Sequence, residues 1–449
     1  MRVNVLIAIL AILAITALIS GCAEKIKENG TGGKLGEVST PPDSYEKPGK
    51  EKIEKVTAFS NFETLEKSHF SRVGNVKNAA WIRFWITWQA IEPEEGKYDF
   101  SFMDKVVKHF QDEGICLLIT IEPFANWDQD KCHGDEYWSR MPLPGGEAEV
   151  KVGKPCNMDA YREFLRKLVE RYDGDSIDDM PGLKYPIKYW EIMNEPGMQG
   201  KDPWDLKFFL GTPQEYLEIL KVSYETIKEA DPEAKVVMGG MSAMMDKFVE
   251  FWEPIIGEAA NYFNIANIHT IDTNEEREDL YVLKFKRFLE KHGVKNKPIW
   301  ITEVQYGSLE EPPEDISSID KLLVRSSVFS IALGAEKLFY IDNWLQYWKS
   351  YSTQKAYETL VNKLSYFDSV EVLRQEYRET FEGAKAEVGQ YKFTVGDKTI
   401  YVLWGNAPLP EEIKGKVKVT DIYGNEKVMD ASEIELSDSP VYVEVLSSG

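Results

Sequence analysis

Two glutamates stand at the ends of separate apolar runs and have the residue type that acid–base chemistry requires. Glu195 ends the stretch "YWEIMNE", and Glu303 ends "PIWITE". Glycoside hydrolysis needs such a pair: one carboxyl group protonates the leaving oxygen, and the other attacks the anomeric carbon or directs water. Taken alone, Asn-Glu-Pro at 194–196 is also typical of a helix N-terminus, where glutamate favours the dipole and proline fits the first turn. The chemistry therefore depends on elements that bring two distant residues together.

Short apolar runs alternate with longer amphipathic stretches over most of the chain. We predict strands at 54–60, 79–86, 115–121, 187–194, 234–240, 263–270, 297–303 and 337–344, with helices between them. Runs that are apolar at nearly every position are typical of a parallel sheet buried on both faces. Eight strand–helix units predict the α/β class and a (β/α)8 TIM barrel, which we place at residues 51–380. No Gly-x-Gly-x-x-Gly follows the first strand, so nothing indicates a dinucleotide cofactor.

The C-terminal residues, 385–449, change to a period of two. They carry β-branched and aromatic residues and turn at Gly-Asp and Gly-Asn. This pattern predicts a small C-terminal antiparallel β domain. We expect its role to be structural, covering one side of the barrel, rather than sugar binding.

The functional side chains of a TIM barrel lie where the strands end and the following loops begin. Glu195 ends the fourth predicted strand and Glu303 the seventh, so their carboxylates are expected to face each other across a central cleft. Other polar or aromatic residues within or at the ends of predicted strands are Arg83, Glu122, Asn194, Ser242, His269 and Trp344. This joint placement favours a catalytic pair over a helix cap at Glu195.

Two stretches carry a family resemblance: "WEIMNEPG" (190–197) and "WITEVQYG" (300–307) resemble the strand-4 and strand-7 signatures of a large clan of retaining glycoside hydrolases on (β/α)8 barrels. The clan includes endoglucanases, β-mannanases, β-xylosidases and β-galactosidases. Residues 88–100 and 211–240 also resemble regions of several of its families. The resemblance implies that Glu195 is the acid/base and Glu303 the nucleophile in cleavage of O-glycosidic bonds of a poly- or oligosaccharide. It implies neither a metal nor an organic cofactor.

Three further residues receive roles near this pair. The clan places an arginine beside the nucleophile, and this arginine is Arg83 here. A buried arginine needs a partner, and the alternative role is a structural salt bridge, for example with Glu122. Glu122 itself departs from the clan pattern, and it either recognises a sugar hydroxyl or pairs with Arg83. Asn194 is expected to hydrogen-bond the sugar 2-hydroxyl, where contacts tighten in the transition state.

The remaining predicted substrate-binding residues are His269, Tyr306 and Trp344. The clan often has a histidine where His269 ends the sixth strand, although a lone histidine is equally typical of a satisfied core position. We expect the Tyr306 hydroxyl to orient the nucleophile and Trp344 to form an aromatic floor beneath the cleaved sugar. The alternative for both rings is core packing.

The first 22 residues resemble an export signal rather than part of the fold. "MRVNVLIAILAILAITALISGC" has a basic start, an apolar run and small residues before a cysteine. The ending "LISGC" resembles the lipobox of prokaryotic lipoproteins and predicts lipidation of Cys22; the alternative is an uncleaved membrane anchor. Residues 23–50 are rich in Gly, Pro, Lys and Glu and predict a flexible linker. Both alternatives place the body outside the cytoplasmic membrane, held at the cell surface.

Charge and cysteine usage limit the partners. The formal net charge of −22 argues against nucleic acid or anionic lipid as the main partner, because phosphates would be repelled. Cys132 and Cys156 flank one loop-like segment and can form a disulfide in an exported protein, whereas Cys116 is expected to be buried. A zinc site is disfavoured because neither a Cys-x-x-Cys nor a paired histidine stands near them. We predict a carbohydrate substrate and no protein partner.

Two rival functions remain open from the sequence. One is a catalytically inactive, carbohydrate-binding lipoprotein on the same barrel, which the presence of both glutamates disfavours. The other is a metal-dependent barrel hydrolase, which the scattered positions of the five histidines disfavour.

Overall fold

The computed structural model describes residues 62, 65–72, 79–143, 146–201, 206–308 and 311–446. The predicted signal peptide (1–22), with Cys22, the predicted linker (23–50) and the predicted first strand (54–60) lie outside the described residues. None of the helices in the described ranges combines the length and apolar character needed to cross a membrane.

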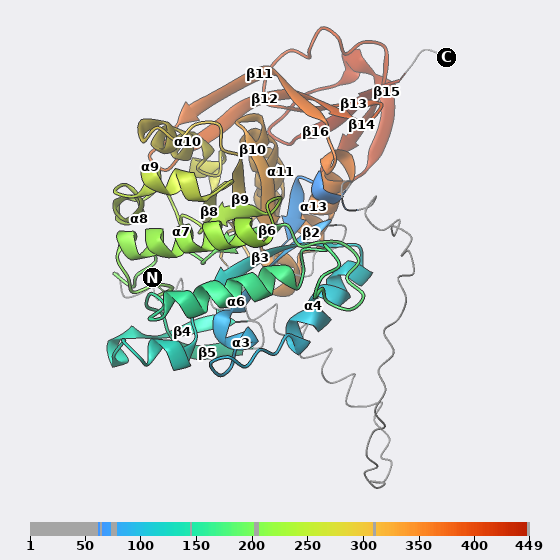
Figure 1. Cartoon of the computed structure of the whole chain (residues 1–449). Helices are drawn as coiled ribbons and strands as arrows, with labels where there is room; N and C mark the ends of the chain where they lie inside the picture. The colour runs from blue at the N-terminus through green and yellow to red at the C-terminus, as the bar shows by residue number, and fades with distance from the viewer. Residues whose placement is uncertain are drawn as a thin grey trace, which may run out of the picture.

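Eight parallel strands close into a barrel, which confirms the predicted fold class (Figure 1). They are β1 (Phe70–Arg72), β2 (Trp81–Thr87), β3 (Cys116–Glu122), β6 (Tyr189–Ile192), β7 (Lys235–Met238), β8 (Ala266–Thr273), β9 (Ile299–Tyr306) and β10 (Ala335–Tyr340). Their spatial order is β7-β6-β3-β2-β1-β10-β9-β8, and parallel bridges from Val237 to Ile265 and from Met241 to Ile268 close the ring. Strand β6 is therefore the fourth barrel strand and β9 the seventh.

The first described barrel strand is β1, not 54–60. It is three residues long and has one large apolar side chain, Phe70. It therefore lacks the run of apolar residues from which the other strands were predicted. Pairing supplies the missing signal: Phe70 lies opposite Leu338 of β10, and Arg72 opposite Ile82 of β2.

Helices lie outside the barrel, and most follow a strand. They are α3 (Trp88–Ile91), α4 (Ser101–Asp112), α5 (Asn126–Gln129), α6 (Met158–Glu170), α7 (Pro213–Ala230), α8 (Asp246–Trp252), α9 (Ile256–Ala259), α10 (Val282–Lys291), α11 (Ile316–Ala332), α12 (Asn343–Gln346) and α13 (Tyr351–Leu364). Short 3-10 helices occur at Asp135–Tyr137, Ala260–Tyr262, Glu275–Arg277 and Ala431–Glu433. Helix α7 shows how local sequence sets a boundary, because the Thr212 hydroxyl accepts from the Glu215 amide while the Glu215 carboxylate accepts from the Thr212 amide.

The two ends of the barrel interior differ in character. Near the strand starts, the Trp81 ring lies edge-on to the Tyr189 ring, with 5.0 Å between the ring centroids. The Tyr189 ring in turn stacks on Trp300, with 5.1 Å between the centroids. The Lys337 ammonium lies 4.3 Å from the Trp81 ring centroid, and burial lowers its pKa to about 7. Aromatic rings thus fill the end at which the strands begin, and the charged groups described below fill the end at which they finish.

The C-terminal sheet is antiparallel and has six strands. They are β11 (Ser369–Glu379), β12 (Ala384–Val395), β13 (Lys398–Trp404), β14 (Lys416–Asp421), β15 (Glu426–Asp430) and β16 (Val441–Val445), in the order β11-β12-β13-β16-β14-β15. The sheet begins at Ser369, inside the range 51–380 that the sequence assigned to the barrel. Strand β11 is a largely exposed edge strand with alternating charges, so it lacked the apolar face by which strands were recognised. Figure 1 shows the sheet lying along one side of the barrel, beside α10 and α11.

A long loop between β3 and α6 carries its own hairpin, formed by β4 (Trp138–Leu143) and β5 (Gly146–Lys151). The disulfide that the sequence allowed is present: Cys132 and Cys156 are bonded across this loop, with 5.8 Å between their α-carbons. Cys116 is buried and free, as expected.

We expect the double variant Cys132→Ser/Cys156→Ser to be less stable than the parent. The disulfide closes a segment with a sequence separation of 24, and the chain-entropy model assigns such a cross-link about 3 kcal/mol. The melting temperature should fall by about 5 °C in calorimetry. Reductant should lower the parent to the same value and leave the double variant unchanged; equal melting temperatures without reductant would contradict a stabilising cross-link.

Candidate active site

Glu195 and Glu303 meet at the carboxyl end of the barrel. Between them lies His269, whose Nδ1 is 2.8 Å from Glu195 Oε1 and 3.7 Å from Glu303 Oε2. One oxygen of each carboxylate and one ring nitrogen lie within 4.8 Å of one another. The glutamates are 4% and 8% exposed, so both are almost enclosed yet still reach the surface. The structure therefore brings together the two residues predicted to be catalytic.

Local irregularities in β6 and β9 aim these side chains. Met193 and Glu195 have positive φ angles, 70° and 40°, which turn the backbone just beyond β6. In β9 the pairing slips on both sides: two-residue steps of β8 (Asn267 to His269) and β10 (Leu338 to Tyr340) lie opposite three-residue steps of β9. This β-bulge lets the consecutive residues Thr302 and Glu303 both contact groups of the site, whereas a regular strand would point one of them away.

Arg83 in β2 is fully buried and contacts the candidate nucleophile. Its Nη1 donates to Glu303 Oε1 at 2.6 Å, and its Nη2 donates to Asn194 Oδ1 at 2.8 Å. Its Nε and Nη2 both donate to Glu191, at 2.6 and 2.9 Å. Burial alone would lower the pKa of Arg83, but the two carboxylates raise it, so the guanidinium stays charged.

Arg83 lies beside Glu303, as the family resemblance implied, and the alternative pairing with Glu122 is wrong. Among the described residues, the carboxylates that pair with Arg83 are Glu191 and Glu303, and no ion pair joins Arg83 to Glu122. Glu122 instead accepts the Asn194 backbone amide on Oε1, at 2.9 Å. Burial raises the pKa of Glu122 to about 8, so this carboxyl is mostly protonated at neutral pH.

Glu191 is the functional residue that sequence reasoning missed. It is fully buried in β6, and besides Arg83 it accepts from Thr120 Oγ1 at 2.9 Å, Asn267 Nδ2 at 2.9 Å and Thr302 Oγ1 at 3.2 Å. The available signal was its position four residues before Glu195, as a charged residue inside an apolar strand. Such a residue requires a charged partner elsewhere in the core.

Burial also sets the protonation of the central groups. It raises the pKa of Glu303, while His269 and Arg83 oppose the rise. It lowers the pKa of His269 to about 4, so the imidazole is neutral near pH 7. The Nε2 atom of His269 lies 2.9 Å from Thr302 Oγ1, which fixes the ring from the side opposite Glu195.

Two predicted substrate-binding residues do not face this site. The Tyr306 hydroxyl shares a 2.7 Å hydrogen bond with Ser326 Oγ of α11 and so does not orient Glu303. Trp344 is fully buried, with its ring 6.4 Å from Tyr306 and 6.1 Å from Tyr357, and it exposes no surface to a sugar. In both cases the alternative of core packing holds.

A metal is a possible occupant of the carboxyl end, because Glu195, His269 and Glu303 could each supply one ligand atom. The Arg83 guanidinium, bound to one of these carboxylates at 2.6 Å, opposes a second cation there. Cys132, His133 and Cys156 also lie close together, but both thiols are consumed by the disulfide.

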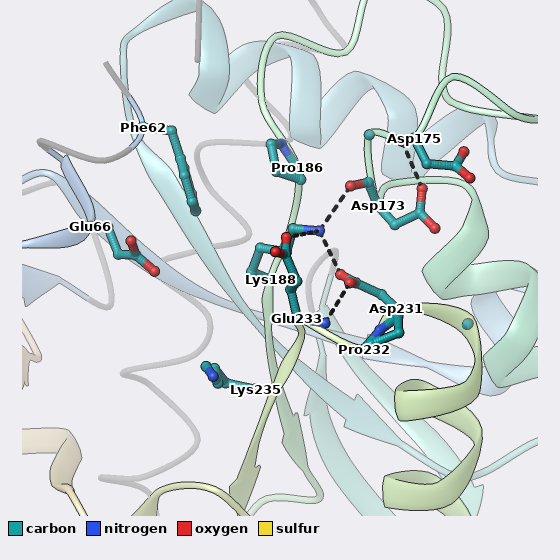
Figure 2. Close-up of a pocket in the computed structure, with 12 residues that line it drawn as sticks. Phe62, Glu66, Asp173, Asp175, Pro186, Lys188, Asp231, Pro232, Glu233 and Lys235 are labelled. Carbon is teal, nitrogen blue, oxygen red and sulfur yellow. Dashed lines mark hydrogen bonds and ion pairs between the residues drawn. The ribbon is translucent and has the colours of Figure 1, made fainter. Parts of the chain in front are cut away.

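The pocket of about 880 Å³ in Figure 2 lies at the other end of the barrel. Lys188 directly precedes β6 and Lys235 begins β7, so the pocket adjoins the strand starts. Its charges satisfy one another: Lys188 Nζ lies 2.7 Å from Asp231 Oδ2 and 3.2 Å from the Asp173 carbonyl oxygen. Asp173 and Asp175 also bring two carboxylates close together in its lining, but at the opposite end of the barrel from Glu195 and Glu303.

Comparison with known proteins shows similarity to glycoside hydrolases. Residues 67–123 match the model of glycoside hydrolase family 42, described as β-galactosidase. β-Galactosidase BbgII of Bifidobacterium bifidum is 24% identical over 128 residues, which cover 26% of this chain and only 16% of that protein. The chain thus spans a small part of that relative's length.

Solved structures match over most of the chain. A family 39 glycoside hydrolase from Bacteroides cellulosilyticus WH2 has a TM-score of 0.55 at 18% identity, covering 85% of this chain and 82% of that one. A family 44 xyloglucanase from Paenibacillus polymyxa has a TM-score of 0.50 at 11% identity, covering 85% and 96%. An α-L-arabinofuranosidase from Thermotoga maritima has a TM-score of 0.50 at 13% identity, covering 86% and 89%. The chain shares the barrel fold of these glycoside hydrolases, and an antiparallel sheet follows the barrel.

Proposed function

We propose that this protein is an exported, lipid-tethered retaining glycosidase that cleaves O-glycosidic bonds of a poly- or oligosaccharide. Glu195 gives its proton to the glycosidic oxygen while a carboxylate oxygen of Glu303 bonds to the anomeric carbon and the leaving group departs. Glu195, now ionised, takes a proton from water, whose oxygen bonds to the anomeric carbon and releases Glu303. Both steps occur at one carbon from opposite faces, so the anomeric configuration is retained.

The separation of the two carboxyl groups is the observation that carries this proposal. Oxygens of Glu195 and Glu303 lie within 4.8 Å of each other. Retaining enzymes place their carboxyl groups about 5–5.5 Å apart, whereas inverting enzymes need about 6.5–9.5 Å to admit a water molecule. The short separation of these oxygens fits the retaining spacing better than the inverting one and supports direct attack by Glu303.

The surroundings of each glutamate suit its proposed role. Arg83 holds Glu303 Oε1 and favours the ionised nucleophile, while Oε2 remains on the side of His269 and Glu195. Asn194 directly precedes Glu195, and its Oδ1 accepts a hydrogen bond from Arg83, which also binds Glu303. This position supports the proposed contact of Asn194 with the sugar 2-hydroxyl. His269, which is neutral near pH 7, contacts Glu195 without placing a positive charge beside it.

The nucleophile is tested by Glu303→Gly after an activity screen of the wild type on β-glucan, mannan, xylan and aryl glycosides. We expect the variant to lose at least about 10⁴-fold in kcat/KM, the scale seen when a covalent nucleophile is removed. Azide should restore turnover of an aryl glycoside and give a glycosyl azide of inverted configuration. Glu233→Gln, at an exposed carboxyl beside the opposite end of the barrel, serves as the control.

Wild-type rates in Glu303→Gly would refute the nucleophile assignment, and a rescued product of retained configuration would refute double displacement. Binding of a polysaccharide by the wild type without turnover of any substrate would favour the rival function, an inactive carbohydrate-binding lipoprotein.

The pH dependence follows from the burial of Glu303. Attack requires the ionised carboxylate, and burial raises the pKa of Glu303 above its ordinary value of 4.5. Activity is therefore present above this raised pKa and lost as the pH falls through it. We expect the acid limb of the kcat/KM profile to lie above pH 4.5 in steady-state assays; an acid limb below that value would contradict the desolvated site.

Export and tethering rest on residues 1–22 and on Cys22. The disulfide between Cys132 and Cys156 supports an oxidising compartment. Expressed in a bacterial host fed labelled palmitate, the wild type should carry the label and sediment with membranes. The Cys22→Ala variant should carry none; label in this variant, or a wild-type chain free of lipid, would overturn lipidation at Cys22.

A further inference from the structure

Glu191 and Glu303 share one guanidinium unequally. The Nε and Nη2 atoms of Arg83 form one planar edge, and both donate to Glu191. Only Nη1 reaches Glu303, through Oε1. Planar two-point pairing is the strongest contact that an arginine makes with a carboxylate. Glu191 therefore holds the stronger of the two ion pairs, although it is not one of the proposed reacting groups.

The surroundings of Glu191 hold its side chain in place. Every hydrogen-bonded partner it has among the described residues is a donor: Arg83, Thr120, Asn267 and Thr302. These donors come from four barrel strands, β2, β3, β8 and β9, so they fix the carboxylate in three dimensions. The guanidinium is held in addition by Trp85, whose ring centroid lies 5.1 Å from the Arg83 central carbon.

We propose that Glu191 is a positioning residue that occupies the two-nitrogen edge of Arg83 and thereby leaves Glu303 with a single guanidinium contact and one oxygen ready to attack. This inference rests on the proposed role of Glu303 as nucleophile. The negative charge of Glu191 partly offsets the positive charge of the arginine, so Glu303 feels less positive charge than an undivided Arg83 would supply. The nucleophile keeps a high affinity for the anomeric carbon, as it does for a proton.

Loss of the Glu191 charge changes how the nitrogens of Arg83 are shared between the two carboxyl groups. The freed edge of Arg83 can turn to Glu303, where a two-point pair would engage both oxygens and stabilise the ionised carboxylate. The result is a weaker nucleophile, because attack must break a stronger ion pair. The same change makes Glu303 a better leaving group in the second step, so the first step should slow while the second does not.

Glu191→Gln tests the proposal in steady-state and pre-steady-state assays on an aryl glycoside that the wild type hydrolyses. We expect kcat/KM, which reports the first step, to fall about 10- to 100-fold. The acid limb of its pH profile should move down by about one pH unit, since Glu303 ionises more readily beside an undivided Arg83. No burst of aglycone should appear, because the second step is not slowed. Glu191→Asp, which keeps the charge on a shorter side chain, should show a smaller shift of the same sign.

Glu122→Gln is the matched control. Glu122 is likewise fully buried at a barrel strand end, but it makes no ion pair with Arg83, and its pKa of about 8 means that it is already uncharged at the acid limb. The same substitution there should leave the acid limb in place. A purely structural role for Glu191 would lower the melting temperature and the activity of Glu191→Gln with its acid limb unmoved, and that result would overturn the proposal.

Two outcomes separate this inference from the proposed function. If azide rescues Glu303→Gly but the acid limb is unmoved in Glu191→Gln, Glu303 is the nucleophile and the role of Glu191 is refuted. If azide fails to rescue Glu303→Gly, the proposed function itself fails. Should Glu191→Gln not fold, Glu191→Asp decides: an unmoved acid limb in that variant refutes the proposal.

Discussion

A single buried guanidinium holds the catalytic end of this barrel together. Arg83 touches Glu191, Asn194 and Glu303, which come from β6, the turn after it, and β9. Removing a charge from water is costly, and the cost is met only when hydrogen bonds and opposite charges surround it. The site therefore cannot be assembled piece by piece: the strands must already lie in register before Arg83 is satisfied. In return, the arginine fixes the distance between side chains that are far apart in the sequence.

Irregular backbone at the ends of β6 and β9 sets the direction in which the side chains of the site point. In a regular strand successive residues point to opposite faces, so neighbours such as Thr302 and Glu303 could not both reach the site. The bulge in β9 removes this restriction, and the left-handed backbone at Met193 and Glu195 does the same after β6. These distortions are retained because the network around Arg83 stabilises them. Their positions at the strand ends match the places where barrels carry chemistry.

Strands with a clear apolar pattern could be predicted from the sequence, whereas contacts that arise only when strands pair could not. Apolar runs at 115–121 and 297–303 match β3 and β9 closely, and the two glutamates followed from counting strands. Strand β1 was missed because its short segment has no pattern of its own. Glu191, the second carboxylate partner of Arg83, was missed because a salt bridge between strands leaves no local signal. Ring orientation is likewise a property of packing, so Tyr306 and Trp344 were assigned to the site although their side chains lie in the core.

The C-terminal sheet takes part in this architecture. The backbone has positive φ angles at Asp272, near the end of the His269 strand β8, and at Leu280 and Tyr281 in the loop that follows. Two carboxylates of this loop receive backbone amides of β12: Glu278 accepts from Ala386 at 2.8 Å, and Asp279 from Ala384 at 2.9 Å.

These contacts extend the sheet onto the rim of the barrel. Arg325 of α11 pairs with Glu278 at 3.0 Å, and burial raises the pKa of this carboxyl to about 7 in spite of that partner. A loop with strained backbone and buried acids is stable only while its partners are present. The sheet thus supports the loop that follows the His269 strand, and the barrel and the sheet are one structural unit at the catalytic end.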